Sequence, residues 1–163
     1  MVNSIMDNQI DYYEPIMSIG MVAQKLNVAV QTIRLYEQEG LILPFKTASG
    51  RRLYSMHDLT RLHCIRKMIK ENGLNLQGIK RIFSFIPCWE FKGGLDNDCL
   101  NCPAYYSAEG PCWSLSKKGD KCALEDCRSC KVYRLEFHCD KLKEIIFGHE
   151  RPVQNKPGEK SNP

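Results

Sequence analysis

The sequence predicts a mainly α-helical chain in two parts, a helical N-terminal half followed by a cysteine-rich half. Through most of residues 17–86, apolar residues recur every three or four positions, which is the period of amphipathic helices. After residue 87 this pattern gives way to glycines, prolines and turns, and seven of the nine cysteines lie between Cys88 and Cys130. A chain of 163 residues is long enough for two small domains, although each then has little core of its own.

Charge and composition narrow the class of protein. The net charge of +4 is compatible with a nucleic-acid partner but does not require one. The first residues do not combine a basic start with an apolar run, and no stretch approaches the roughly 18 apolar residues that a membrane span needs. We therefore expect a cytoplasmic protein with no membrane partner. Because thiols stay reduced there, the cysteines favour metal binding over a disulfide framework or free thiols.

Two short helices are expected near the N-terminus. One apolar stripe, capped by Ser18, predicts the first helix. The second runs from about residue 30 to residue 39 and is ended by Gly40. Ala29 precedes it without a capping side chain, a loss of about 1 kcal/mol. Two short helices joined by a tight turn have the outline of a helix-turn-helix. The stripe of the first helix consists of Ile19, Val22, Ala23 and Leu26.

A small hairpin and two further helices are expected next. In "LILPFKTASGRRLY", two extended runs flank the turn residues Ala-Ser-Gly, which predicts a two-stranded wing. Ser55 and Asp58 form an S-x-x-D start for a third helix, which Gly73 ends. Asn75 caps a fourth helix, and Pro87 stops it. These elements together predict a winged helix-turn-helix.

Residues 17–86 resemble the N-terminal winged helix-turn-helix of the MerR family of transcription regulators. The resemblance rests on Ile19 and Ala23, on "TIRLYEQEGL", on "GRRLY" in the wing and on "SMHDLTRL". "ENGLNLQGIKRI" is similar to the heat-shock-repressor-like branch of that family. The resemblance implies a homodimer that binds double-stranded promoter DNA and works with RNA polymerase. It implies no enzymatic activity, and the sequence has no paired catalytic groups or phosphate loop that would suggest one.

The candidate DNA contacts lie on the second helix and on the wing. Short polar groups near the start of a recognition helix reach base edges, and nearby cations hold phosphates. The resemblance implies DNA contacts for Arg34 and Tyr36 on the helix and for Arg52 and Tyr54 on the wing. The alternative is that the tyrosines are core aromatics and the arginines a solvated face. The full set is Gln31, Thr32, Arg34 and Tyr36 on the helix, and Lys46, Arg51, Arg52 and Tyr54 on the wing. Arg61, Arg66, Lys67, Lys70, Lys80 and Arg81 are expected to be mainly solvent-exposed.

The cysteine-rich segment contains an internal repeat. Each copy begins with Cys-Trp, continues to a Cys-x-x-Cys pair and ends with a tyrosine three residues later. Two such pairs strongly indicate a metal site, because each tight turn brings two thiolates onto one ion or cluster. The predicted ligands are Cys88, Cys99 and Cys102 in the first copy and Cys112, Cys122, Cys127 and Cys130 in the second. Trp89 matches Trp113, and Tyr105 matches Tyr133. Cys64 and Cys139 are expected to be small packing residues.

The metal is either an iron–sulfur cluster or zinc. "CALEDCRSC" has the C-x4-C-x2-C spacing that some iron–sulfur proteins use, and zinc accepts the same thiolates. We favour the cluster slightly, since only a redox-active centre adds sensing chemistry to a regulator. The repeat also resembles a bacterial cysteine-rich module called two-CW. The predicted function is therefore a MerR-type regulator with a metal or redox sensor; the alternative is a zinc-stapled structural or interaction module with no sensing role.

The predicted domain organisation has five parts. Residues 1–16 form a flexible arm, 17–86 the DNA-binding domain and 87–131 the cysteine module. Residues 132–148 form a helix, because their apolar positions repeat with 3-4-3-4 spacing. That helix either dimerises or packs on the rest of the chain. Residues 149–163 form a disordered tail.

Overall fold

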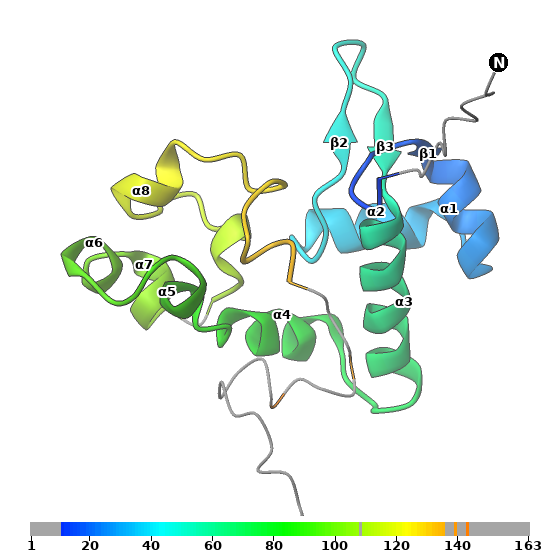
Figure 1. Ribbon diagram of the computed structural model, residues 1–163. Coiled ribbons are helices and arrows are strands. Elements are labelled where there is room, and N and C mark those ends of the chain that lie inside the picture. Colours follow the sequence, from blue (N-terminus) through cyan, green and yellow to red (C-terminus); the bar gives the residue numbers. More distant parts are fainter. Residues whose placement is uncertain (1–10, 108, 136–138, 140–142, 144–163) are drawn as a thin grey trace, which may run out of the picture.

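Residues 11–107, 109–135, 139 and 143 are described by the computed structural model (Figure 1). The helix-turn-helix consists of α1 (Ile19–Leu26) and α2 (Val30–Gln38). The Ser18 side chain accepts a hydrogen bond from the backbone N–H of Met21 at 3.3 Å, which confirms the predicted cap of α1. Asn27 ends α1 in a left-handed conformation with φ of 50° and begins the tight turn. Both predicted helices are therefore confirmed.

A small antiparallel sheet packs next to these helices. The wing strands β2 (Phe45–Lys46) and β3 (Arg52–Tyr54) pair as predicted, and β1 (Met17–Ser18) adds to the other side of β3. Met17 lies opposite Tyr54 in the register, and both side chains are buried. The predicted two-stranded wing is therefore the outer part of a three-stranded sheet. The hairpin extends away from the helices (Figure 1).

Two further helices complete the N-terminal domain. α3 (Met56–Lys70) begins with the predicted capping box, in which Ser55 and Asp58 each accept a hydrogen bond from the other's backbone N–H. α4 (Leu76–Ser84) is capped by Asn75, which accepts a hydrogen bond from the Gly78 N–H at 2.8 Å. Side chains from the four helices and from strands β1 and β3 form one core. Among its fully buried members are Val22, Ile33, Leu41, Ile42, Tyr54, Leu62, Ile65 and Ile79. The fold is the predicted mainly α winged helix-turn-helix.

Short helical turns make up the cysteine-rich part. They are grouped beyond the C-terminal end of α4 and away from α1 (Figure 1). Prolines, glycines and frequent polar residues keep each turn to three or four residues. The elements are α5 (Cys88–Phe91), α6 (Asn97–Leu100), α7 (Pro103–Tyr106), the 3-10 turn η1 (Cys112–Ser114) and α8 (Asp120–Ala123).

Part of the predicted arm is bound to the domain. The Tyr12 hydroxyl donates a hydrogen bond to Thr60 Oγ1 at 3.0 Å, and the Tyr12 carbonyl accepts one from the His57 N–H. The rings of Tyr13 and His57 lie 5.2 Å apart. Residues 11–16 are therefore not a flexible arm, because two aromatic side chains hold them against α3. The rest of the predicted arm, and the predicted tail at 149–163, lie outside the described residues.

The predicted C-terminal helix does not begin at residue 132. Residues 132–134 form turns and residue 135 a bend, and the adjacent side chains of Val132 and Tyr133 are both 1% exposed. Apart from Cys139 and Lys143, the remaining residues of that prediction lie outside the described part of the chain. Within the described part, no helix is long and apolar enough to cross a bilayer.

Candidate nucleic-acid interface and thiol cluster

Two exposed polar side chains of α2 are among those predicted to reach DNA. Gln31 and Arg34 are exposed, and Thr32 is half-buried near the start of the helix. Ala29 gives no side-chain cap, as expected, and its carbonyl accepts a hydrogen bond from the Thr32 N–H at 3.0 Å. Tyr36 faces the core and is 6% exposed. Three of the four predicted α2 residues are therefore accessible to a ligand.

The wing carries its cations around a hydrogen-bonded turn. Lys46 and Arg51 are exposed, and Arg52 is half-buried. Thr47 accepts from the Arg51 N–H through its side chain and from the Gly50 N–H through its carbonyl, at 3.1 and 2.8 Å. These bonds fix the turn between the two strands, so the three cations project from a defined hairpin.

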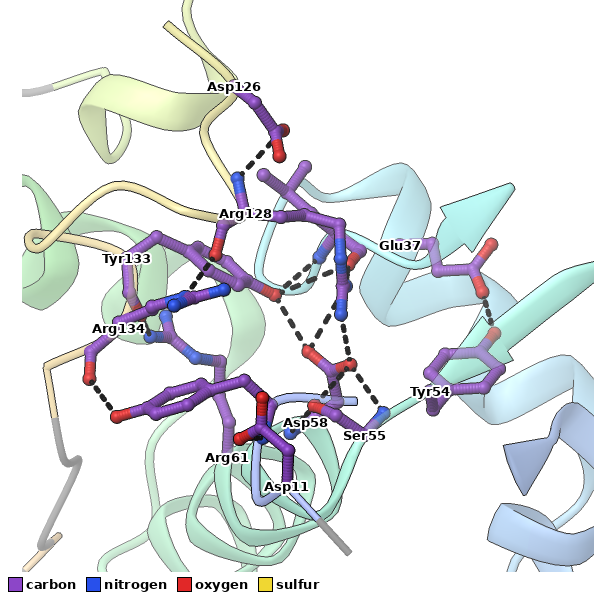
Figure 2. Close-up of polar contacts among 12 residues, drawn as sticks. Asp11, Glu37, Tyr54, Ser55, Asp58, Arg61, Asp126, Arg128, Tyr133 and Arg134 are labelled. Atoms are coloured by element: carbon purple, nitrogen blue, oxygen red, sulfur yellow. Dashed lines mark hydrogen bonds and ion pairs between the residues drawn. The ribbon is translucent and has the colours of Figure 1, made fainter. Parts of the chain in front are cut away.

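Glu37 joins the wing to α2, a role that was not predicted from the sequence. Its carboxylate forms an ion pair with Arg52 at 2.7 Å. It also accepts a hydrogen bond from the Tyr54 hydroxyl (Figure 2). Burial, and then the bond to Glu37, raise the pKa of Tyr54 well above its usual range. Tyr54 is fully buried, and its hydroxyl binds the same carboxylate as Arg52. Its predicted contact with DNA stays a prediction. The available signal was an acid three residues after Arg34 on the recognition helix.

Arg61 is buried, which corrects the expectation of a solvent-exposed charge. Its side chain is 1% exposed and donates a hydrogen bond to the Tyr133 carbonyl. Its guanidinium lies 4.3 Å from the ring centroid of Tyr133 and 4.9 Å from that of Trp113. Contacts of this kind offset part of the cost of removing a cation from water. Arg61 thus fixes the second copy of the cysteine repeat to α3.

The seven predicted metal ligands gather around two adjoining cavities. Cys88 and Cys122 line both of them. The first cavity, of about 20 Å³, also has Cys112, Cys127 and Cys130 in its wall. The second, of about 30 Å³, also has Cys99 and Cys102. All seven side chains are free thiols. Within the described residues, however, no three His, Cys, Asp or Glu side chains have the arrangement of a metal site.

Burial and mutual repulsion keep two of these thiols protonated. The pKa of Cys88 is raised to about 11, first by burial and then by the neighbouring Cys102 and Cys122. The pKa of Cys112 is raised to about 12 by burial and by the charges that Cys88 and Cys130 would carry. Cys88 therefore interacts electrostatically with Cys112 of the first cavity and with Cys102 of the second.

Positive and N–H groups surround the sulfur atoms. Lys118 donates a hydrogen bond to Cys127 Sγ at 2.8 Å, and the Gly119 N–H donates one to Cys102 Sγ at 3.2 Å. Lys92 lines both cavities. Hydrogen bonds to sulfur and nearby cations stabilise thiolates and tune the centres that thiolates bind. These donors would therefore hydrogen-bond the sulfur atoms of a centre that the thiols hold.

Each copy of the repeat contains the same aromatic pair. The rings of Trp89 and Tyr105 lie 5.2 Å apart at 65°, and those of Trp113 and Tyr133 lie 5.3 Å apart at 85°. Edge-to-face contacts of this kind contribute about 1 kcal/mol each. The matched tryptophans and tyrosines of the sequence are therefore structural counterparts, with one pair beside each Cys-x-x-Cys turn.

Cys64 of α3 forms a disulfide with Cys139, although both were expected to be reduced packing residues. No local sequence signal indicates this pairing, because the two residues are 75 positions apart. Neither belongs to the repeat. The thiols around the two cavities are thus separate from this disulfide.

Residues 17–86 match the sequence model of a family described as MerR HTH family regulatory protein. They form a MerR-family helix-turn-helix domain. Over 68 residues the chain is 38% identical to heat shock protein HspR of Streptomyces coelicolor, covering 42% of this chain and 45% of that protein. Over 69 residues it is 41% identical to the mercuric resistance operon regulatory protein of Bacillus cereus, covering 42% and 52%. Over 68 residues it is 35% identical to the transcriptional regulator GlnR of Bacillus anthracis, also covering 42% and 52%.

These relatives confirm the family of the N-terminal domain and leave its branch open. The three identities are similar, so the heat-shock-repressor-like branch stays a prediction. The chain spans about half the length of these relatives. The matching part has the size of the MerR-family domain, and the cysteine repeat lies outside residues 17–86.

Proposed function

We propose that the chain is a transcription regulator that binds promoter DNA through its MerR-family domain and holds a metal centre in its cysteine repeat. Two of the relatives that carry the same domain are named as a transcriptional regulator and an operon regulatory protein, and none of the three names denotes an enzyme. The whole protein is proposed to act as a homodimer on double-stranded promoter DNA, with RNA polymerase as its partner. Two half-sites contacted by a dimer allow a change of protein geometry to alter the DNA between them.

The DNA half of this proposal is carried by exposed cations on two adjoining elements. Arg34 projects from α2, and Lys46 and Arg51 project from the wing, while the ion pair between Glu37 and Arg52 joins the two elements. A recognition helix flanked by a basic wing can read base edges and hold phosphates at the same time. Gln31 and Thr32 then lie at the helix end that enters the major groove.

The experiment is a salt titration of DNA binding with a duplex selected from a random-sequence pool by the wild-type protein. Because phosphate contacts release counterions, the logarithm of the affinity should fall linearly with the logarithm of salt. Arg34→Ala and Arg52→Ala should each weaken binding, with a slope smaller by about one if the residue holds a phosphate. Lys117→Ala removes an exposed cation of the cysteine part and is the matched control. A flat salt response, or equal effects of all three variants, would contradict the DNA proposal.

The metal half of the proposal rests on the thiols around the two cavities. Seven free thiols, the sulfur-directed N–H groups and the nearby lysines suit a thiolate-bound centre. We propose an iron–sulfur cluster or zinc as the bound group, with the cluster favoured slightly because it adds redox sensing. The predicted ligands remain Cys88, Cys99, Cys102, Cys112, Cys122, Cys127 and Cys130.

Metal and acid-labile sulfide analysis of protein purified without oxygen tests this half directly. Iron with sulfide and a brown colour identifies a cluster, whereas colourless protein with stoichiometric zinc identifies the structural alternative. The paired variants Cys99→Ser/Cys102→Ser and Cys127→Ser/Cys130→Ser should each bind less metal than wild type. Cys64→Ala, which alters a cysteine outside the cluster, should bind the wild-type amount. Folded wild-type protein with neither iron nor zinc would contradict the proposal.

A further inference from the structure

We infer that the second Cys-x-x-Cys turn controls the wing through Arg128, which lies between Cys127 and Cys130 and contacts both ends of the wing hairpin. The inference rests on the proposed metal binding and adds the route by which that binding reaches the DNA-contacting surface. It concerns the second copy of the repeat, since the contacts described below all come from that copy.

Arg128 reaches one end of the wing at Asp58. The distance from Arg128 Nη2 to Asp58 Oδ2 is 2.9 Å, and the Asp58 side chain is fully buried (Figure 2). The same carboxylate accepts hydrogen bonds from the N–H and the hydroxyl of Ser55, at 2.8 and 3.0 Å. Ser55 directly follows Tyr54, the last residue of β3. The ion pair is therefore connected to Ser55, the residue that follows the wing strand carrying Arg52.

Arg128 reaches the other end of the wing at Leu43. Its Nη1 donates a hydrogen bond to the Leu43 carbonyl, two residues before β2 begins at Phe45. A single guanidinium thus binds the chain just before the hairpin and just after it. Because Arg128 is only 16% exposed, these contacts are shielded from water and from salt.

Tyr133, three residues after the Cys-x-x-Cys pair, repeats this double contact. Its hydroxyl accepts a hydrogen bond from the Leu43 N–H at 2.9 Å and donates one to Asp58 Oδ1 at 3.2 Å. Its ring packs against Trp113, whose Nε1 donates to the Gly40 carbonyl at 2.9 Å. The residue that closes the second copy is therefore held at the same two points as Arg128.

These contacts connect the thiols to the DNA-contacting surface over a short path. A metal ion or cluster bound by Cys127 and Cys130 fixes the backbone between them, and Arg128 is part of that backbone. Changing the position of Arg128 changes its pairing with Asp58 and Leu43, and so the angle at which the wing leaves the domain. Lys46, Arg51 and Arg52 move with the wing, so their fit to the DNA backbone depends on the state of the thiols.

The first copy of the repeat supplies an internal comparison. Its aromatic pair, Trp89 and Tyr105, lies beside Cys99 and Cys102. Among the described residues, no hydrogen bond or ion pair joins that Cys-x-x-Cys turn to the wing. We therefore assign the control of the wing to the second Cys-x-x-Cys turn. The first turn lies at the adjoining cavity, and Cys88 and Cys122 line both cavities.

The test is hydrogen exchange of the wing amides in the full chain, with and without bound metal. One arm uses zinc alone, and a second uses ferrous iron with sulfide, with bound metal measured in each sample. Thermodynamic coupling of this kind usually changes an equilibrium by at least about fivefold. In wild type, metal should change the exchange of residues 45–54 by about that factor or more. Arg128→Met should bind metal but lose this response, and Lys131→Met, which removes an exposed cation beside Cys130, should keep it.

Tyr133→Phe provides a milder variant in case Arg128→Met does not fold. It removes only the hydroxyl that contacts Leu43 and Asp58, and should weaken the response while the ring keeps its packing. Bound metal with no change in wing exchange, or the same change in wild type and Arg128→Met, would overturn the inference alone. Absence of bound metal in both arms would overturn the metal half of the proposed function and the inference with it.

Discussion

The Glu37 carboxylate and the Arg52 guanidinium form a 2.7 Å ion pair between the recognition helix and the wing. Glu37 also accepts a hydrogen bond from the buried Tyr54 hydroxyl, so it holds two wing residues at once. We expect Glu37→Gln to weaken both bonds, since hydrogen bonds to a charged group are stronger than those to a neutral amide. Unfolding free energy should fall by about 1 kcal/mol, and DNA affinity by about fivefold.

Chemical denaturation and duplex binding measure the two effects of Glu37→Gln. Glu71→Gln, at an exposed position just after α3, is the matched control for a lost negative charge. If both variants bind DNA as wild type does, Glu37 does not position the wing.

The Asp58 carboxylate binds Ser55 at the start of α3 and both Arg128 and Tyr133 of the second cysteine copy. Its charge should therefore matter more to stability than its size. Asp58→Asn keeps an oxygen for the Ser55 N–H but leaves Arg128 without its anion. Removing one partner of a buried ion pair is strongly destabilising, and we expect a loss of about 3 kcal/mol in unfolding free energy. Urea denaturation should show this loss, whereas Asp120→Asn, at an exposed residue of α8, should change stability little. Similar values for both variants would show that the Arg128 pair contributes nothing.

Gly40 allows the second cysteine copy to approach the end of α2. Its φ is +71°, and a Cβ there would lie 2.6 Å from Ser114 Cβ. Gly50 has a φ of +78° but nothing within 4 Å of such a Cβ. Gly50→Ala should therefore cost about 1 kcal/mol from backbone strain, and Gly40→Ala about 3 kcal/mol because overpacking adds to it.

Thermal or urea denaturation of the two alanine variants separates strain from contact. Adding Ser114→Gly to Gly40→Ala should restore the part that comes from overpacking and leave the backbone strain. Equal costs at the two glycines would mean that η1 is not held against α2 in solution.

His57 should make the protein less stable in mild acid. Burial, and then the nearby Arg61 charge, lower the pKa of His57 from 6.5 to about 4. Between these values the unfolded chain binds a proton that the folded chain does not. The free energy of unfolding should therefore fall as the pH drops through this window, by up to about 1.4 kcal/mol per pH unit.

Denaturation curves at about pH 7 and about pH 5 would measure this loss. His57→Phe suits the surrounding tyrosines and should reduce the difference between the two curves. His63→Gln, at an exposed position on α3, should leave the difference unchanged. An unchanged difference in His57→Phe would show that another group causes the acid sensitivity.

Local sequence signals predicted the N-terminal domain well. Ser18, Ser55 and Asn75 cap the helices that the apolar periodicity indicated, and Gly40 follows α2. Each of these signals acts within four residues of its effect, so one sequence is enough to find it. The third strand of the sheet was missed because β1 is only two residues long and pairs with a strand far along the chain.

Contacts between distant residues could not be found in the same way. Arg61 was expected to be an ordinary surface charge and Asp58 only a helix cap, yet both also contact residues about 70 positions away and are buried. The apolar spacing after Val132 suggested a helix, but the hydroxyl of Tyr133 is held by Leu43 and Asp58. The repeat itself did predict one long-range feature, since the two aromatic pairs that it matched are both present.

The duplication also separates the two halves of the cysteine region spectroscopically. The chain has two tryptophans, and each belongs to a different Cys-x-x-Cys copy. Trp113 is 5% exposed, whereas Trp89 is more accessible. Single-tryptophan proteins made with Trp89→Phe or Trp113→Phe would therefore report, by fluorescence quenching, which copy responds first when a ligand or an oxidant arrives.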